Sequence, residues 1–416
     1  MQIAIVHEND AWADSRCVLG DRPSDDTSQF CAALASQGYT VTAYSRGRRK
    51  RSSAAKTGYR IVASDIGPPP PAAPAEVLPF VTEWAAQLGE LWASNPPEIV
   101  HAFGWLAGLA AQLAARRQQL ATVQTFCGLA ATIGPDTDHC AAATERARIE
   151  PLLARNASWV TGGSSREIDT LSRLRRRRAQ ISLLPKGIDS GRYFVPEPRP
   201  AEDRLLRIVQ LDRDPLPWHG FDRVIRALPK LRETELVLGQ TEKESARHTR
   251  AWDELRRLAR DFGVSDRVQF SGHVVAREIP SLLHSADVVA CTPRQAPHAT
   301  TALAAMASGV VVVGVAVDAL VDVVVNGVTG SLVSPSRPHE LTAALKVLTS
   351  SRFQRESMGS AGRSRLLSRF TWDRIALDAS TIYESISAQR HGPAIATDSS
   401  GMSEAATASA TPRAAT

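Results

Sequence analysis

Short apolar runs rich in valine and isoleucine alternate along the chain with longer segments of helical periodicity. Because these runs have no polar face, both faces of their sheets should be covered by helices, which is typical of parallel sheets. The sequence therefore predicts an α/β protein with two doubly wound, Rossmann-like domains that face a central cleft. The runs that predict strands are 2–6, 39–44, 59–63, 98–102, 122–126, 158–161 and 181–184 in the first half, and 206–211, 235–238, 268–270, 287–291, 310–315 and 330–333 in the second.

Proline-rich segments interrupt this alternation. Residues 195–202 combine prolines at positions 196, 198 and 200 with charged residues, which predicts a stiff, exposed connector. We therefore expect a first domain at 1–196 and a second at 197–372. From 389 to 416 the chain is rich in alanine, serine and threonine and poor in bulky apolar residues, so a disordered tail is expected there.

Composition limits the cellular compartments and the classes of binding partner that can be expected. The five cysteines show no spacing typical of a zinc site, and their odd number favours a reduced, cytoplasmic compartment. The N-terminal apolar stretch is too short for a signal peptide, and no run approaches the roughly 18 apolar residues of a membrane span. The net charge of +6 argues only weakly for anionic partners, and no nucleic-acid partner is expected.

Two basic clusters, 46–51 and 173–178, stand out in the first half of the chain. Basic residues near an anionic leaflet contribute about 1 kcal/mol each. They predict a weak, salt-sensitive attachment of the first domain to the inner membrane surface. Solvated surface charge is an equally good interpretation of the same residues.

Candidate chemistry lies where predicted strands end, because ligands of doubly wound sheets bind at the carboxyl ends of the strands. The segment 101–105 lies at the end of the strand 98–102, and its His101 is either on the rim of the cleft as a catalytic residue or packed in the core. Arg213 follows the strand 206–211 and offers a fork of donors suited to phosphate. His219, just before a predicted helix, could add positive charge. The triplet 212–214 matches the DxD pattern of some metal-dependent transferases, but so short a match is common by chance, and no metal is expected.

Two further strand ends complete the set. Gly272 and His273 follow the strand 268–270, where a glycine allows a base or a sugar to approach the backbone closely. Thr300 or Thr301 caps a short helix that stops at Gly309, and the capped end makes an anion site. We expect the cleft to be lined by His101, Arg213, His273 and the start of the Thr300 helix. Tight packing of a small-residue helix on the sheet explains the fourth segment equally well.

Taken in order, several stretches resemble the retaining glycosyltransferases of the GT-B fold, in family four (glycosyl transferase group 1). The resemblance covers about residues 1–388 and implies that a last helix, 373–388, crosses back onto the first domain. The matching stretches are 101–108, 125–129, 184–189, 220–228, 268–290, 305–309, 325–333 and 369–373.

The resemblance also shows departures in the donor site. Such proteins carry an Arg and a Lys after the first strand of the second domain; Arg213 fits the first, and His219 stands where the Lys is expected. They also carry two glutamates, whose positions here are Ala296 and Ala304. A glycine pair expected near 21–22, a histidine expected at 127 and a Gly-Gly expected at 318–319 are absent too.

The resemblance implies transfer of a sugar from a nucleotide-sugar donor, with retention, to a lipid, glycan or small-molecule acceptor that the sequence does not identify. No cofactor is expected beyond the donor itself. The alternative is a catalytically inactive relative that binds a nucleotide, a sugar or a partner protein. Under that alternative the site is rebuilt, with His219 and His298 as its new polar groups.

Overall fold

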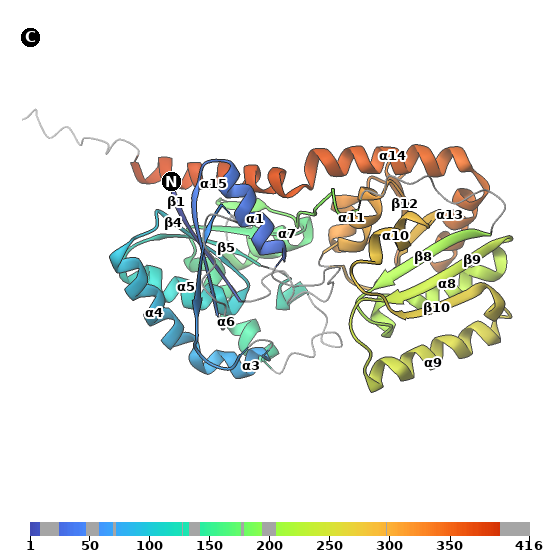
Figure 1. Cartoon of the computed structure of the whole chain (residues 1–416), viewed down its shortest axis with the longest axis horizontal. Helices are drawn as coiled ribbons and strands as arrows, with labels where there is room; N and C mark the ends of the chain where they lie inside the picture. Colours follow the sequence, from blue (N-terminus) through green and yellow to red (C-terminus); the bar gives the residue numbers. More distant parts are fainter. Residues whose placement is uncertain are drawn as a thin grey trace, which may run out of the picture.

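The computed structural model describes residues 1–8, 25–46, 58–69, 72–126, 128–132, 142–175, 179–193, 205–296 and 298–391. They form two α/β domains placed side by side along the long axis of the molecule (Figure 1). The connector expected at 195–202 and the tail beyond residue 391 lie outside the described residues. No helix in the described ranges has the length and apolar character needed to span a membrane.

The first domain is built on a parallel seven-stranded sheet of order β3-β2-β1-β4-β5-β6-β7. Apolar side chains fill both of its faces: Ile3 and Ile5 of β1 point into one core, and Ala4 and Val6 into the other. Its strands are β1 (Gln2–His7), β2 (Thr40–Arg46), β3 (Arg60–Ser64), β4 (Ile99–Phe103), β5 (Ala121–Thr125), β6 (Trp159–Gly162) and β7 (Ile181–Leu183). Its helices are α1 (Asp25–Ser36), α3 (Pro74–Val77), α4 (Val81–Ser94), α5 (Trp105–Arg117), α6 (Ala143–Asn156) and α7 (Ser165–Arg175).

The second domain has a parallel six-stranded sheet of order β10-β9-β8-β11-β12-β13, again with a core on each face. Every strand predicted from an apolar run is present, and the prediction of two Rossmann-like parallel sheets is confirmed. The strands are β8 (Leu206–Asp212), β9 (Thr234–Gln240), β10 (Val268–His273), β11 (Val288–Cys291), β12 (Val311–Val315) and β13 (Gly330–Val333). The helices are α8 (Phe221–Ala227), α9 (Ala246–Asp261), α10 (Ile279–His284), α11 (Thr300–Ala307), α12 (Asp318–Val323), α13 (Pro338–Ser350) and α14 (Arg352–Arg369).

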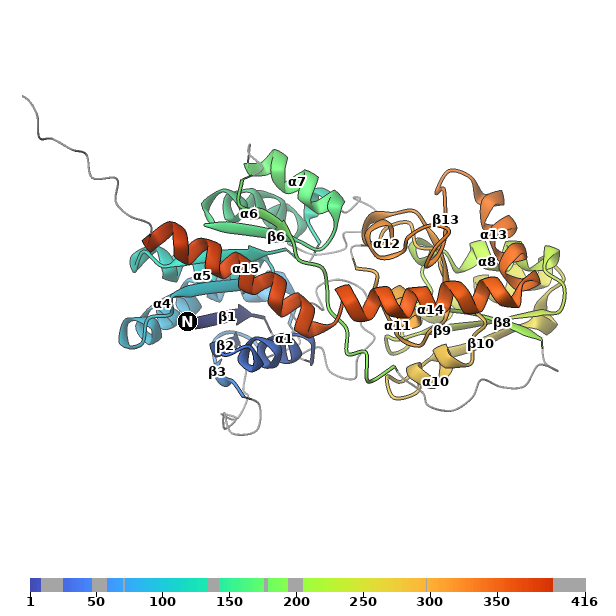
Figure 2. The same cartoon turned by 90° about the horizontal axis from the view of Figure 1, so that it is seen from above.

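The last helix, α15 (Trp372–His391), leaves the second domain and packs against α1 of the first (Figures 1 and 2). Tyr383 and Trp372 of this helix are buried in the same core as Phe30 of α1. Residues 389–391, expected to begin a disordered tail, continue this helix.

The chain thus passes between the domains twice, and the two passages touch. Ile188 forms a parallel bridge with Thr371, and its N–H donates to the Phe370 carbonyl at 2.8 Å. The Trp372 ring lies against Gly187, where an added Cβ would come within 2.6 Å of it. A glycine is needed at this point because the two passages approach so closely.

Candidate active site

A pocket lies at the carboxyl ends of β8 and β11 in the second domain. The strand order reverses there, since the chain runs from β8 outward to β9 and β10 before it returns to β11. Such a switch point is where doubly wound sheets bind their ligands. The pocket is lined by Asp212, His219, Cys291, Pro293, Gln295, Ala296, His298, Ala299, Thr300, Thr301, Ala302 and Leu320.

His219 supplies a buried positive charge to this pocket. Its Nδ1 lies 2.7 Å from Asp212 Oδ1, and its Nε2 lies 3.3 Å from Asp214 Oδ1. Burial alone would lower the pKa of His219, but the charge of Asp212 and the hydrogen bonds to both carboxylates outweigh it and raise the pKa to about 9. The imidazole is therefore protonated at neutral pH, as the sequence prediction of positive charge at this position requires.

The loop that carries His219 is held against β11 by a glycine. Gly220 has a φ of 71°, a conformation that side chains rarely adopt, and a Cβ there would overlap the carbonyl oxygen of Thr292. The Thr292 hydroxyl donates to the Gly220 carbonyl at 2.8 Å. Close backbone packing against the residue after β11 therefore helps to fix this loop, together with the contacts of His219.

Thr300 and Thr301 open helix α11 at the edge of the pocket, where its first N–H groups have no intrahelical partner. The Thr301 hydroxyl donates to the carbonyl of Leu211 at 3.1 Å, which ties the helix to the end of β8. The Thr300 hydroxyl is buried and makes no hydrogen bond within the described part of the chain. The pocket therefore combines a helix N-terminus with a buried donor.

Arg213 is directed away from this pocket. Its Nε and Nη2 donate to the two carboxylate oxygens of Glu242, at 3.0 and 3.2 Å. Arg213 does not line the pocket, so a phosphate there could recruit it only by displacing Glu242. The pairing could not be anticipated from sequence because Glu242 lies 29 residues away.

The expectation that His101 lies on the rim of the cleft is wrong. Its side chain is fully buried, its Nδ1 is 2.6 Å from the Tyr383 hydroxyl, and its Nε2 is 2.6 Å from the Thr125 hydroxyl. Its ring also stacks on Phe103. Burial lowers the pKa of His101 to about 3, so the ring is neutral at physiological pH. These surroundings favour the alternative interpretation, a packed histidine that ties α15 to the first sheet.

The remaining predicted residues divide between the pocket and its surroundings. His298 lines the pocket and is almost fully buried. Gly272 and His273 end β10, separated from β8 by β9, and do not line the pocket. Ala304 lies one turn into α11 with no exposed surface, inside the apolar core.

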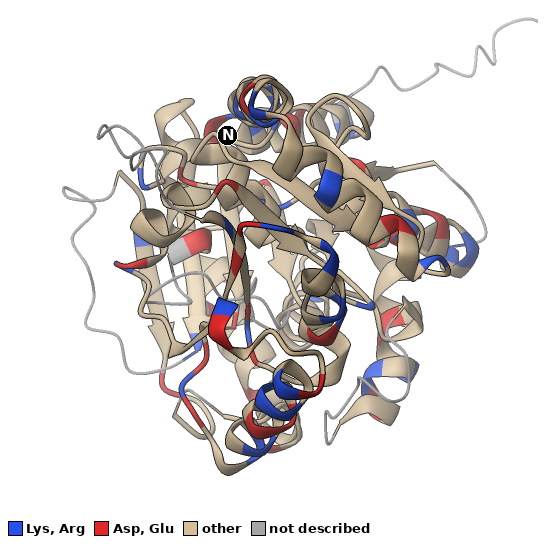
Figure 3. Cartoon of the chain, turned by 90° about the vertical axis from the view of Figure 1, so that its right-hand side faces the viewer, with Lys and Arg blue, Asp and Glu red and all other residues tan. Residues whose placement is uncertain are grey.

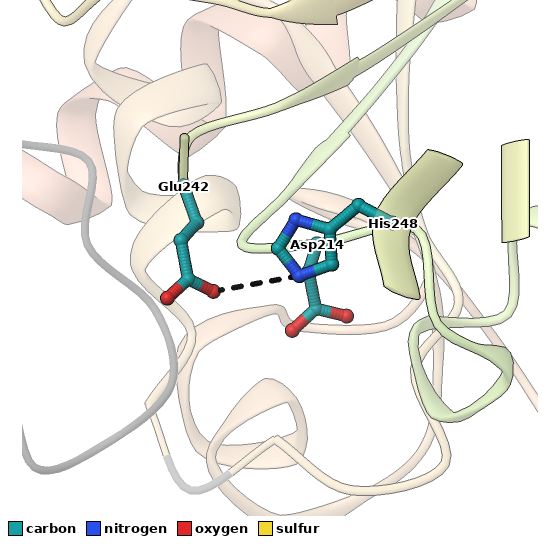
Figure 4. A group of neighbouring side chains, drawn as sticks. All are labelled: Asp214, Glu242 and His248. Carbon is teal, nitrogen blue, oxygen red and sulfur yellow. Dashed lines mark ion pairs between the residues drawn. The ribbon is translucent and has the colours of Figure 1, made fainter. Parts of the chain in front are cut away.

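Beside the pocket, Asp214, Glu242 and His248 bring one potential metal-ligand atom each within 4.8 Å of one another (Figure 4). The hydrogen bonds of His248 argue against a metal ion there. The Gln240 amide is oriented by the Trp252 indole and a backbone carbonyl, and its nitrogen lies 3.3 Å from His248 Nδ1. Nδ1 therefore accepts, so a proton lies on Nε2, which faces Glu242 at 3.9 Å. An N–H group suits a carboxylate and cannot coordinate a cation.

The basic clusters give little support to membrane attachment. Arg46 is buried and donates to the carbonyls of Ile66 and Pro68, while Arg175 is buried and donates to those of Ala154 and Ala157. Their expected place on the surface is therefore wrong. Positions 47–51 and 176–178 lie outside the described residues. Elsewhere, basic and acidic residues are interspersed along the helices that face the viewer in Figure 3.

Two family models match the chain. The model of "Glycosyl transferases group 1" matches residues 215–365, and that of the "Glycosyl transferase 4-like domain" matches residues 24–187. Together they span most of both domains, so the chain belongs to the group 1 glycosyltransferases of the GT-B fold.

Individual relatives agree with this membership. The chain is 28% identical to a glycogen synthase of Mycobacterium tuberculosis, over 69% of this chain and 68% of that protein. It is 29% identical to a D-inositol 3-phosphate glycosyltransferase of Actinosynnema mirum, over 67% of this chain and 70% of that one. It is also 29% identical to an MMP alpha-(1->4)-mannosyltransferase of Mycolicibacterium hassiacum, over 54% of this chain and 53% of the relative.

Solved structures share the fold at lower identity. Sucrose-phosphate synthase from Thermosynechococcus elongatus superposes with a TM-score of 0.76 at 20% identity, over 94% of this chain and 100% of that chain. HepE of Anabaena, in complex with UDP and glucose, superposes with a TM-score of 0.65 at 17% identity, over 92% of this chain and 100% of that chain.

Proposed function

We propose that this protein transfers a sugar from a nucleotide-sugar donor, whose diphosphate binds in the pocket between β8, β11 and α11. One observation carries the proposal. The pocket is lined by a buried hydroxyl without a hydrogen bond among the described residues, that of Thr300, which lies beside the protonated ring of His219 and at the N-terminus of α11. Buried donors that lack a partner are costly, so they indicate a ligand with acceptor oxygens.

The charge of the site suits such a ligand without a metal ion. Negative charge builds on the diphosphate as the sugar leaves, and it is stabilised by fixed donors and cations. His219 is a fixed cation, and the helix N-terminus adds partial positive charge. We therefore propose that binding needs no metal, and the proton on His248 Nε2 supports this.

The names of the relatives support transfer of a sugar as the class of reaction. They include a glycogen synthase and a mannosyltransferase, and the HepE structure contains UDP and glucose. By the same likeness we propose retention of configuration and a cytoplasmic place of action. Donor sugar and acceptor stay unassigned in this proposal.

The alternative function, binding without transfer, is favoured by a separate observation. Arg213 is paired with Glu242, and His219 with two aspartates, so these two cations are already balanced by carboxylates of the same site. Ala296 and Ala304 offer no side-chain acceptor to a sugar or ribose. A protein that binds a nucleotide sugar but transfers nothing would show both features.

Titration calorimetry with UDP, GDP and ADP tests the binding half of the proposal. A diphosphate at 100 times its dissociation constant should stabilise the fold by about 2.7 kcal/mol. Thr300→Val should weaken binding by about 1 kcal/mol, because it removes one donor with little change in volume. Thr381→Val is the matched control, since its exposed hydroxyl lies on α15, away from the pocket.

The outcomes are distinct. Binding that survives EDTA and weakens only in Thr300→Val supports the site as proposed. Binding that is lost when EDTA is added contradicts metal-free binding. If none of the three diphosphates binds, the proposed site is rejected. Release of free sugar or transfer from a panel of UDP-, GDP- and ADP-sugars then separates the enzyme from the binding-only alternative.

A further inference from the structure

Away from the two chain passages, the domains are joined by helices α7 and α12 (Figure 2). Both oxygens of the Asp322 carboxylate accept from Ser165: one from the backbone N–H at 2.8 Å, the other from the hydroxyl at 2.5 Å. Arg166 Nη1 lies 2.6 Å from Asp318 Oδ1. Two carboxylates of the second domain thus contact the first turn of α7 in the first domain, where negative charge is stabilised by the helix dipole.

Asp318 holds an unusual backbone conformation for this contact. Its φ is 42°, in the left-handed region that residues other than glycine seldom adopt. Its side chain is only 8% exposed, and Oδ2 accepts from the backbone N–H of Ala296 at 2.8 Å. The two oxygens of one carboxylate therefore connect the pocket wall, at Ala296, with the first domain, at Arg166.

A second contact joins the same pocket wall to the first domain. Gly163, at the end of β6, lies beside His298, and a Cβ on that glycine would be 3.5 Å from the imidazole ring. The Gly163 N–H is held by Glu167 Oε2 at 2.7 Å, and Glu167 belongs to the same first turn of α7. Ala296 and His298 are thus each supported from the first domain by the start of α7.

From this geometry we propose that Asp318 is a positioning residue: with Arg166, Ser165 and Asp322 it forms a latch that holds the domains closed and sets the pocket wall in its ligand-binding form. When the latch opens, Ala296 loses the support of the first domain and the wall relaxes. The statement about the wall rests on the proposed function of the pocket. The statement about closure does not, because it concerns only the contact between the domains.

Small-angle X-ray scattering of the full chain without ligand tests closure. Arg166→Gln combined with Asp322→Asn removes the ion pair and the charge on the start of α7, and neither side chain belongs to an apolar core. We expect a larger radius of gyration and maximum dimension than in the wild type, and a similar change in the wild type at high salt. Asp253→Asn is the matched control, since it removes an exposed ion pair to Arg256 within α9. A double variant whose scattering equals that of the wild type at both salt concentrations overturns the latch.

Calorimetry with UDP and GDP tests the effect on the wall. Arg166→Gln should weaken binding by up to about fivefold, the range of a partly exposed ion pair. Asp318→Asn should weaken it as well, while Asp318→Glu, which keeps the charge, should retain more affinity than Asp318→Asn. Unchanged affinity in a double variant that scatters as an opened molecule overturns the coupling. If the wild type binds no nucleotide, the proposed function fails, and the scattering result still decides the latch.

Discussion

Replacing His219 with glutamine should remove the part of the pH dependence of stability between pH 6 and pH 10 that its buried charge contributes. Both aspartates beside it favour the protonated ring, so its pKa is about 9 in the folded protein and about 6.5 when the chain is unfolded. A group whose pKa is higher in the folded protein than in the unfolded chain stabilises the fold. This stabilisation is fully present at pH values below the unfolded pKa. That stabilisation is lost as the pH rises through the folded pKa.

The expected loss of unfolding free energy follows from the difference between these two pKa values. About 2.5 pH units at 1.36 kcal/mol each give about 3 kcal/mol, a sizeable share of the stability of an ordinary domain. The site is only 5% exposed, so solvent screening reduces this value little. Glutamine keeps a hydrogen-bond donor for Asp212 but cannot carry the charge.

Urea unfolding at a series of pH values measures the effect. The wild type should lose about 3 kcal/mol of unfolding free energy between pH 6 and pH 10 beyond any loss seen in His219→Gln. His284→Gln is a suitable control, since His284 lies on α10, outside the pocket. Parallel pH curves for the wild type and His219→Gln would refute the charged state that we assign to His219, and with it the fixed cation of the pocket.

Three further substitutions test other parts of the structure. Gly220→Ala should destabilise the fold by about 1–3 kcal/mol more than Gly309→Ala, because both glycines have positive φ but only Gly220 lacks room for a Cβ; urea unfolding of the pair checks this. Tyr383→Phe should cost about 1–3 kcal/mol by leaving a ring nitrogen of buried His101 unbonded, and an unchanged melting temperature would contradict that hydrogen bond. Ala304→Glu should lower stability by several kcal/mol and should not tighten UDP or GDP binding, because Ala304 is enclosed in the apolar core; tighter binding in calorimetry would show that a carboxylate there reaches the ligand.

The fold could be predicted from sequence because each strand coincides with a short apolar run of neighbouring residues. The runs 3–6 and 310–313 carry apolar residues at consecutive positions, and burial on both faces of a parallel sheet is the arrangement that satisfies them. His219, Thr300 and Thr301 could also be placed, since the segments that follow β8 and β11 lie at the ligand-binding edge of the sheet.

The rest of the site depends on partners that local sequence does not reveal. His101 follows the same strand-end rule as Thr300, yet Tyr383, which lies 282 residues later, covers it. Arg213 is paired with Glu242, and the buried Arg46 donates to a backbone carbonyl beyond the end of β3. The triplet 212–214 matches the DxD pattern, from which no metal was predicted, and its two aspartates hold the charge of His219. In each case a polar or charged side chain is satisfied by another part of the chain.

The return of α15 to the first domain also sets an order of events during synthesis. The first core lacks Trp372, Ile375 and Tyr383 until the ribosome has made the entire second domain. The groove beside α1 must therefore stay open while the second domain emerges and folds. A nascent chain stalled before residue 372 would expose an apolar surface from the half that was made first, which makes the N-terminal half the more dependent on chaperones during translation.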